Sequence, residues 1–196
     1  MFILASGSPR RKELLQQIKA RFEIRISTAE EIAGDKLPPE ELVVKNAAAK
    51  ARAVARLYPN QAVLGADTVV ALNGHTYGKP DSCEDAVRML REFSGKTHQV
   101  LTGIAWVYND HLFTDVVTTE VEFAPMADTE IERYVKSGEP MDKAGAYAIQ
   151  GGAAEFIVGI KGSFSNVVGL PLNAVVRLAR KAGVNLYGDY GEGFAP

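Results

Sequence analysis

Two turn signals, each placed beside long strand-like runs, constrain the fold of this chain more than any other feature. Asn73-Gly74 follows the run 61–72, and Asn109-Asp110 separates the runs 97–107 and 111–123. Such dipeptides favour the turns that join hairpin strands, and the two strands of a hairpin are antiparallel. The sheet of this protein is therefore expected to be antiparallel in part.

Helical segments are interleaved with these strands. Pro38 opens an alanine-rich helix that Pro59 ends, and Asp81 or Ser82 caps a helix that Gly95 ends. This alternation predicts a mixed α/β fold. We expect helices from residue 9 onward, over 38–58, 82–94, 128–136 and 171–182, and further strands over 2–5, 21–26, 75–77, 153–161 and 167–169.

Length and composition predict one domain. The chain has 196 residues, of which 46% are hydrophobic, enough for one substantial core but short for two domains. We expect that domain to cover residues 1–182. The remaining segment, 183–196, is rich in glycine and has no periodicity, which favours a flexible tail.

Charge and cysteine content argue against several protein classes. The net charge is −2, and the Lys and Arg residues are scattered, so an extended surface for nucleic acid or an anionic membrane is disfavoured. Cys83 is the only cysteine, and no apolar run approaches the roughly 18 residues that span a bilayer. His75, His98 and His111 are far apart and share no metal-site spacing. A cytoplasmic protein is the expected result.

The first helix begins with cations where anions are favoured. Ser8 fits the N-cap and Pro9 the first helical position, and Arg10, Arg11 and Lys12 follow. A helix N-terminus already carries partial positive charge, so this turn is suited to a phosphate. We expect Ser6 and Ser8 of the turn to contribute to substrate binding. A solvated basic turn is an equally plausible interpretation of this segment alone.

An acid stands in the middle of an apolar strand. Asp67 is flanked by Val63, Leu64, Val69 and Val70, and a carboxylate buried there must reach a cation, a metal or water. Such acids are candidates for catalysis. The structural alternative is a carboxylate bonded to backbone N–H groups at a bulge beside Gly65.

Further charged residues could complete a phosphate site. Glu30 and Glu31 lie on a polar loop, where a solvated pair is the simpler interpretation; one of them folded over Asp67 would suit a cation such as Mg²⁺. Lys50 and Lys79 would add positive charge, although surface lysines are more common. No Walker lysine loop and no GxGxxG fingerprint occurs.

Five separated motifs occur in an order typical of one family. They are Ser6-Gly7-Ser8-Pro9-Arg10-Arg11-Lys12-Glu13-Leu14-Leu15, Gly65-Ala66-Asp67-Thr68, Gly78-Lys79-Pro80, Met141-Asp142-Lys143-Ala144-Gly145-Ala146-Tyr147 and Val168-Gly169-Leu170-Pro171. Through them the chain closely resembles the Maf family of nucleoside triphosphate pyrophosphatases, from Leu4 to about Leu178. The resemblance implies an elongated mixed sheet with helices around a central cleft, similar to inosine triphosphate pyrophosphatases, and a homodimer.

The resemblance also implies a reaction and its residues. A nucleoside triphosphate would be cleaved between its α and β phosphates, with a divalent cation, Mg²⁺ or Mn²⁺, as cofactor. The acid that matches Asp67 is regarded as the proton acceptor, and Glu31 would help it to hold the metal. The matching phosphate-binding residues are Arg10, Arg11, Lys50 and Lys79.

Three positions imply a base preference. Arg10, Thr68 and Gln150 are similar to the dTTP/UTP branch, whereas the branch that prefers 7-methyl-GTP has Trp, Gln and Glu in these places. An amide both donates to and accepts from a pyrimidine edge, while a carboxylate only accepts. We therefore expect dTTP and UTP, ordinary or modified, as substrates. Ala148 and Phe164 depart from the commoner Gly and Tyr.

Two competing functions are kept. One is a nucleic-acid-binding or cell-division (septum) regulatory protein without turnover, because the family has been linked with septum formation. This chain offers a local basic cluster rather than the extended basic groove with stacking aromatics that a strand binder uses. The other is cleavage at the terminal phosphate, which would release orthophosphate instead of pyrophosphate.

Overall fold

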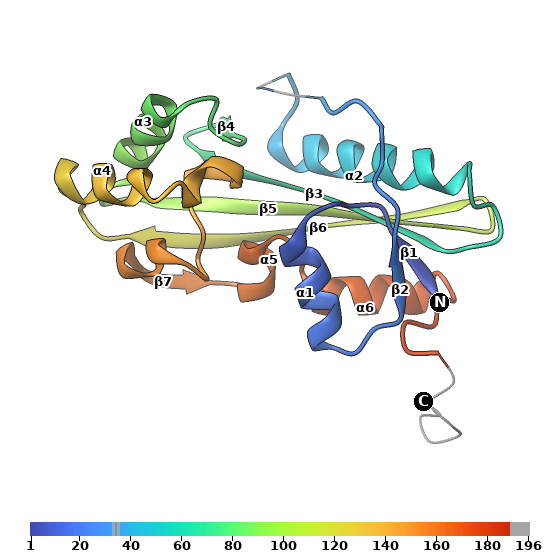
Figure 1. Ribbon diagram of the computed structural model, residues 1–196. Helices are drawn as coiled ribbons and strands as arrows, with labels where there is room; N and C mark the ends of the chain where they lie inside the picture. Colours follow the sequence, from blue (N-terminus) through green and yellow to red (C-terminus); the bar gives the residue numbers. More distant parts are fainter. Residues whose placement is uncertain (33, 35, 189–196) are drawn as a thin grey trace.

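A long mixed sheet runs through the molecule (Figure 1). The computed structural model describes residues 1–32, 34 and 36–188, and within them seven strands form one sheet in the order β2-β1-β3-β5-β6-β7, with β4 paired to β3. Along β3, β5, β6 and β7 each strand is antiparallel to its neighbour, while β1 and β2 are parallel to each other and to β3. The strand bounds are Phe2–Leu4 (β1), Phe22–Ile24 (β2), Val63–Leu72 (β3), His75–Tyr77 (β4), Thr97–Tyr108 (β5), His111–Phe123 (β6) and Ile157–Lys161 (β7).

Helices cover both faces of this sheet. In Figure 1, α2 and α3 lie above it, and α1, α5 and α6 lie below it. The bounds are Pro9–Gln17 (α1), Pro39–Ala55 (α2), Cys83–Phe93 (α3), Asp128–Lys136 (α4), Phe164–Val168 (α5) and Leu172–Lys181 (α6), with 3-10 turns at Glu139–Asp142 (η1), Ala144–Ala146 (η2) and Gly152–Phe156 (η3). The predicted mixed α/β architecture is confirmed.

One predicted strand is wrong, and another begins later than predicted. The segment 167–169 was expected to be extended, but Val167 and Val168 end helix α5, which Ser163 caps by accepting a hydrogen bond from Asn166 N. The segment 153–161 becomes a strand only at Ile157, after η3. Short apolar runs do not distinguish a strand from a buried helical turn, so neighbouring caps decide.

The end of α2 also differs from the prediction. The helix stops at Ala55, and Leu57 N and Tyr58 N bond instead to carbonyls three residues earlier. Such bonds tighten the last turn of a helix, and Pro59 disfavours a helical conformation at Tyr58.

Glycines on two strands allow α2 to lie directly against the sheet. A Cβ on Gly65 would lie 2.2 Å from Ala47 O, and one on Gly103 would lie 2.4 Å from Val43 O. On β5, Gly103 pairs in register with Asp67. Asp67 itself lies on β3, two residues beyond Gly65. Because alternate strand residues share a face, the side chain of Asp67 faces the same helix.

The two largest parts of the apolar core involve different helices, and two smaller parts lie beneath α2. Of the largest two, the first packs α3 and α4 onto the sheet around Phe93 and Phe123, and the other packs α1 and α6 around Trp106. His98 is buried in the first part, and burial lowers its pKa to about 4, so the ring is neutral at physiological pH. This histidine is a core strand residue.

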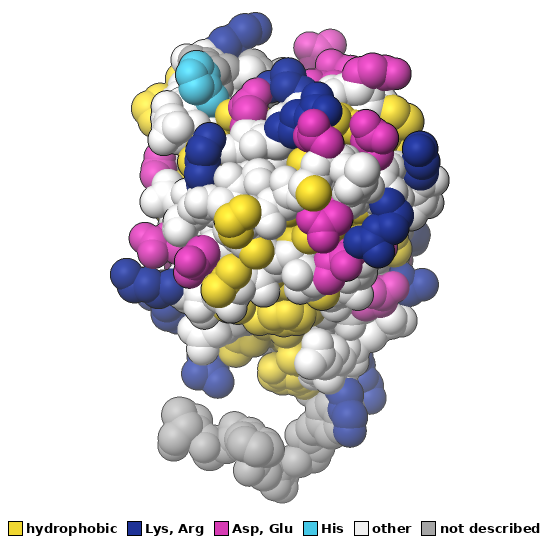
Figure 2. All heavy atoms as spheres, turned by 90° about the vertical axis from the view of Figure 1, so that its left-hand side faces the viewer, with side chains coloured by type: hydrophobic (Ala, Val, Ile, Leu, Met, Phe, Trp, Pro, Cys, Tyr) yellow, Lys and Arg dark blue, Asp and Glu magenta, His cyan; other side chains and the backbone are white. Residues whose placement is uncertain are grey.

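The surface at the α3–α4 end carries charges of both signs. Figure 2 shows acidic and basic side chains interspersed on this face, with apolar groups between them. No helix within the described ranges is long and apolar enough to cross a membrane.

The segment after residue 182 contacts the core before it leaves the described range. Leu186 is buried, and its carbonyl accepts a hydrogen bond of 2.8 Å from Arg21 N. Residues 189–196 lie outside the described residues, so the flexible tail and the domain limits stay predictions.

The contact between α2 and the sheet predicts a strong effect of one methyl group. Gly103→Ala should lower the free energy of unfolding by about 1–3 kcal/mol, because the added Cβ meets helix backbone that cannot rotate away. Urea unfolding measures this loss. Gly159→Ala on β7 is the matched control, since a Cβ there meets nothing within 4 Å; equal stability of the two variants would contradict the argument.

Candidate functional site

A cleft of about 650 Å³ opens over the middle of β3. Its walls are the turn between β1 and α1, the inner face of α2 and the segment 142–150. All the site residues predicted from the sequence lie in its lining. They are Ser6, Ser8, Arg10, Arg11, Glu31, Lys50, Asp67, Thr68, Lys79 and Gln150.

Arg11 ties the start of α1 to the centre of the sheet. Its guanidinium donates hydrogen bonds to Gly169 O (2.9 Å), Ala66 O (2.9 Å), Ser6 Oγ (3.1 Å) and Thr68 Oγ1 (3.1 Å). Burial lowers the pKa of this guanidinium from its ordinary value, while the nearby carboxylates act in the opposite direction. Most of its hydrogen-bonding capacity is used within the protein, so Arg11 organises the cleft floor as well as adding positive charge.

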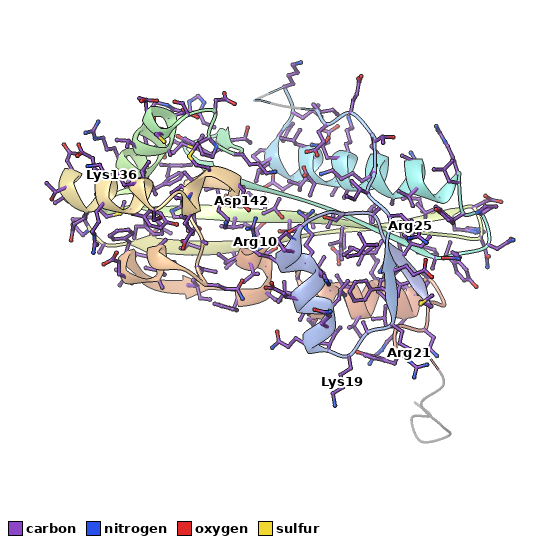
Figure 3. All side chains as sticks on the ribbon, in the orientation of Figure 1. Arg10, Lys19, Arg21, Arg25, Lys136 and Asp142 are labelled. Carbon is purple, nitrogen blue, oxygen red and sulfur yellow. The ribbon has the colours of Figure 1, made fainter. Side chains whose placement is uncertain are left out.

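Arg10 points across the cleft mouth to the segment after α4. Figure 3 shows Arg10 and Asp142 side by side, although 132 positions separate them in the sequence. Arg10 Nη1 lies 3.1 Å from Asp142 Oδ2, and Nη2 donates to Asp142 O at 3.2 Å. Lys143 Nζ contacts the same carboxylate. Partial desolvation raises the pKa of Asp142, but the hydrogen bonds from Lys143 and Arg10 lower it overall, so the group is ionised at neutral pH.

Asp67 is buried, and a side chain of α2 contacts each of its carboxylate oxygens. Lys50 Nζ lies 2.8 Å from its Oδ1, and Asn46 Nδ2 donates to its Oδ2 at 2.9 Å. Lys50 also contacts Glu31 Oε1 at 2.9 Å, so one ammonium group bridges both acids. The expected cation partner of Asp67 is thus Lys50, whose side chain is 12% exposed and is not a surface lysine.

The two carboxylates share one cation, the Lys50 ammonium. Asp67 and Glu31 each place an oxygen within 3 Å of Lys50 Nζ, so both can approach one positive charge. Mg²⁺ commonly uses one or two carboxylates together with substrate phosphate oxygens. The donor set therefore fits such an ion.

The remaining predicted residues lie around the rim and floor. Thr68 Oγ1 lies 3.0 Å from Thr102 Oγ1 on β5, beside its bond to Arg11. Lys79 and Gln150 are exposed where they line the cleft. The structure therefore brings cations, two acids and an amide into one concave site.

Comparison with known proteins identifies this arrangement. Residues 1–182 match the family model described as Maf-like protein. The chain belongs to the Maf-like family. A protein of Symbiobacterium thermophilum named dTTP/UTP pyrophosphatase is 47% identical over 185 residues, covering 94% of this chain and 95% of the relative. Proteins with the same name from Halalkalibacterium halodurans and Gloeobacter violaceus are 46% and 49% identical, over 92% and 90% of this chain and 95% and 93% of theirs.

The predicted N-cap of α1 is confirmed, and the structural alternative considered for Asp67 is wrong. Ser8 occupies the N-cap position, but within the described chain its side chain forms no cap bond; Ser6 Oγ accepts from Ser8 N at 3.3 Å instead. Asp67 is held by α2 side chains rather than by backbone at a bulge, since β3 pairs with β5 in unbroken register from Val63 to Ala71.

Sequence reasoning on this Maf-like chain missed three residues of the site. Asn46 is buried and also clamps the loop that carries Glu31, accepting from Ile32 N at 2.9 Å and donating to Ile32 O at 3.0 Å. Its position four residues before Lys50, on the same helix face, is a signal that could have revealed it. Asp142 and Lys143 were quoted within a motif but given no role, because nothing local shows that they face Arg10.

Proposed function

We propose that this Maf-like protein hydrolyses the bond between the α and β phosphates of dTTP and UTP, releasing the monophosphate and pyrophosphate. The observation that supports this most is the buried acid Asp67 in a cleft that also presents Arg10, Lys50 and Lys79. Phosphoryl transfer requires positioning and charge stabilisation more than covalent chemistry by the protein. The names of the relatives agree with this activity.

The cations provide the binding of the triphosphate. Lys79 has no ion pair with a described residue and is free to contact phosphate oxygens, and Arg10 can exchange the Asp142 carboxylate for phosphate. Arg11 and the serines Ser6 and Ser8 shape the turn at the helix N-terminus, where backbone N–H groups favour an anion.

Asp67 acts as the proton acceptor. Its carboxylate takes a proton from a water molecule, the water oxygen bonds to the α phosphorus, and the bond to the bridging oxygen breaks so that pyrophosphate leaves. Lys50 and Asn46 hold the carboxylate in place, each through one of its oxygens. A base so positioned contributes typically ~10²–10⁴-fold to a rate.

A divalent cation, Mg²⁺ or Mn²⁺, is the proposed cofactor. Asp67 and Glu31 would hold it through lone pairs that Lys50 leaves unused, because an ionised carboxylate can accept about four bonds. Such an ion supplies neutralisation of phosphate charge during the reaction.

Three residues would select the base. Arg10, Thr68 and Gln150 all line the cleft, and the exposed amide of Gln150 can both donate and accept at a pyrimidine edge. Modified pyrimidine nucleotides are included in the proposal. The role would be to remove such nucleotides from the pool, and we place the protein in the cytoplasm, where that pool is used.

We also propose a homodimer. β7 ends the strand order of the sheet, and Val158, Ile160 and Phe164 on and after it are exposed at 63%, 37% and 49%. Val158 and Ile160 share one face of this strand, because they are two residues apart. An apolar edge of this kind suits a second copy of the chain.

Product analysis with Asp67→Asn tests the reaction. The wild-type protein should release pyrophosphate and monophosphate from UTP and dTTP with Mg²⁺ or Mn²⁺, and none in EDTA. The variant should lose at least about 100-fold in turnover, because an amide cannot accept the proton. Asp110→Asn in the exposed β5–β6 turn is the control and should keep full activity.

Three outcomes would contradict this assignment. Orthophosphate as the product would indicate cleavage at the terminal phosphate. No turnover of any triphosphate would favour the nucleic-acid-binding or division-regulating alternative. Full activity of Asp67→Asn would remove Asp67 from the mechanism.

Gln150→Glu tests base selection. The variant should lose roughly tenfold in kcat/KM for UTP and dTTP, because the carboxylate has no donor for the pyrimidine carbonyl. Steady-state kinetics over a panel of triphosphates measures this change, with Gln17→Glu on the exposed side of α1 as control. Unchanged relative rates among the nucleotides would refute the role.

Val158→Lys tests the dimer. A buried lysine in the interface is costly, so the variant should shift the mass in light scattering from two chains to one. Leu57→Lys, at another exposed apolar position beyond α2, should leave the mass unchanged. A wild-type protein that is monomeric at all concentrations would refute the proposal.

A further inference from the structure

A rigid turn carries Gln150 into the cleft. Residues 148–151 form this turn, in which Gly151 N donates to Ala148 O at 3.1 Å. Gln150 is at its third position and is exposed, while Ile149 beside it packs against the apolar core. The point and direction from which the Gln150 side chain leaves the backbone therefore depend on what holds the two ends of the turn.

One side chain holds each end. Ala148 N donates to the hydroxyl of Tyr134 at 3.1 Å, and Gly152 N donates to both carboxylate oxygens of Glu139, each at 3.1 Å. These bonds flank Ile149 and Gln150, one at the residue before Ile149 and the others at the second residue after Gln150. The N–H groups of Ala148 and Gly152 are thus bonded to protein side chains rather than to water.

The two supports are joined to each other and anchored in the core. The Tyr134 hydroxyl donates to Glu139 Oε1 at 2.7 Å. Because the hydroxyl oxygen accepts from Ala148 N, the single hydroxyl proton is the one donated to Glu139. The donor and the acceptor of each bond around Tyr134 and Glu139 are therefore defined. Tyr134 is 4% exposed, and its ring packs edge-on against Phe156 with centroids 5.8 Å apart.

The glycines beside Gln150 are part of the same arrangement. A Cβ on Gly151 would lie 2.3 Å from the Glu139 carboxylate, and one on Gly152 would lie 3.3 Å from the Tyr134 ring. Only residues without a side chain allow both groups to approach the turn so closely.

We infer that Tyr134 and Glu139 are positioning residues for base selection, acting through Gln150; this inference rests on the proposed function. Neither of them is among the described residues that line the cleft. UTP presents an N–H donor and a carbonyl acceptor where CTP presents the reverse pattern, and an amide that is free to turn over fits both. Holding the turn limits the positions from which the amide can meet the base, and so favours the edge that it reaches in its preferred orientation.

Selectivity between UTP and CTP measures this effect. Tyr134→Phe removes the hydroxyl but keeps the ring, and Glu139→Ala removes the carboxylate. Each should lower the ratio of kcat/KM for UTP over CTP by about 3–10-fold, the range expected for one or two hydrogen bonds. The change should lie mainly in KM for UTP, and Glu139→Gln, which keeps an acceptor oxygen, should restore part of the ratio.

Matched controls separate this effect from general loss of structure. Tyr58→Phe removes a hydroxyl that bonds Arg25 outside the cleft, and Glu132→Gln changes an exposed acid on α4. Both should leave the ratio unchanged. If Tyr134→Phe fails to fold, as judged by thermal unfolding, the Glu139 variants decide the question.

The outcomes distinguish this inference from the proposed function. A wild-type protein that shows no preference for UTP would overturn the proposed base selection, and with it the inference. A selective wild type whose variants keep the UTP/CTP ratio within twofold would overturn the inference alone. An equal loss of activity on both nucleotides would assign Tyr134 and Glu139 a merely structural role and would also overturn it.

Discussion

The close approach of α2 to strands β3 and β5 is the constraint on which the site depends. Gly65 and Gly103 leave no side chain between the helix and the sheet. At this separation Lys50 and Asn46 reach a carboxylate in the middle of β3. The cost of burying Asp67 is offset by a cation and an amide that the same contact supplies. The packing of α2 on the sheet therefore also places the side chains that surround Asp67.

Paired charges keep the free cleft stable while leaving it suited to an anion. Lys50 balances Asp67 and Glu31 on the floor, and Asp142 balances Arg10 and Lys143 at the mouth. Cations that would otherwise repel one another at the start of α1 are thus compensated within the protein. When a phosphate replaces Asp142, Arg10 exchanges one anionic partner for another. The basic turn therefore does not depend on bound substrate for its stability.

The sequence was informative wherever a local rule applied. Hairpin dipeptides, caps and prolines predicted the strands around Asp67 and most helices, and the charge reversal at α1 together with the acid in β3 indicated a phosphate site. Local rules failed between residues 151 and 169, where η3 replaces the first part of one predicted strand and α5 replaces another. Their apolar runs are too short for periodicity to decide, and Ser163 and Gly169 set the conformation of α5.

The sequence by itself determined the mixed α/β class, the family and the residue types available for chemistry, because these follow from periodicity, turn residues and motifs. Only the tertiary structure decided which side chains meet. The ammonium shared by Asp67 and Glu31, the pair formed by Arg10 and Asp142, and the support of the Gln150 turn by Tyr134 and Glu139 each join different elements of the fold. Contacts between separate elements are set by how the helices pack on the sheet, and no local pattern in the chain records that packing.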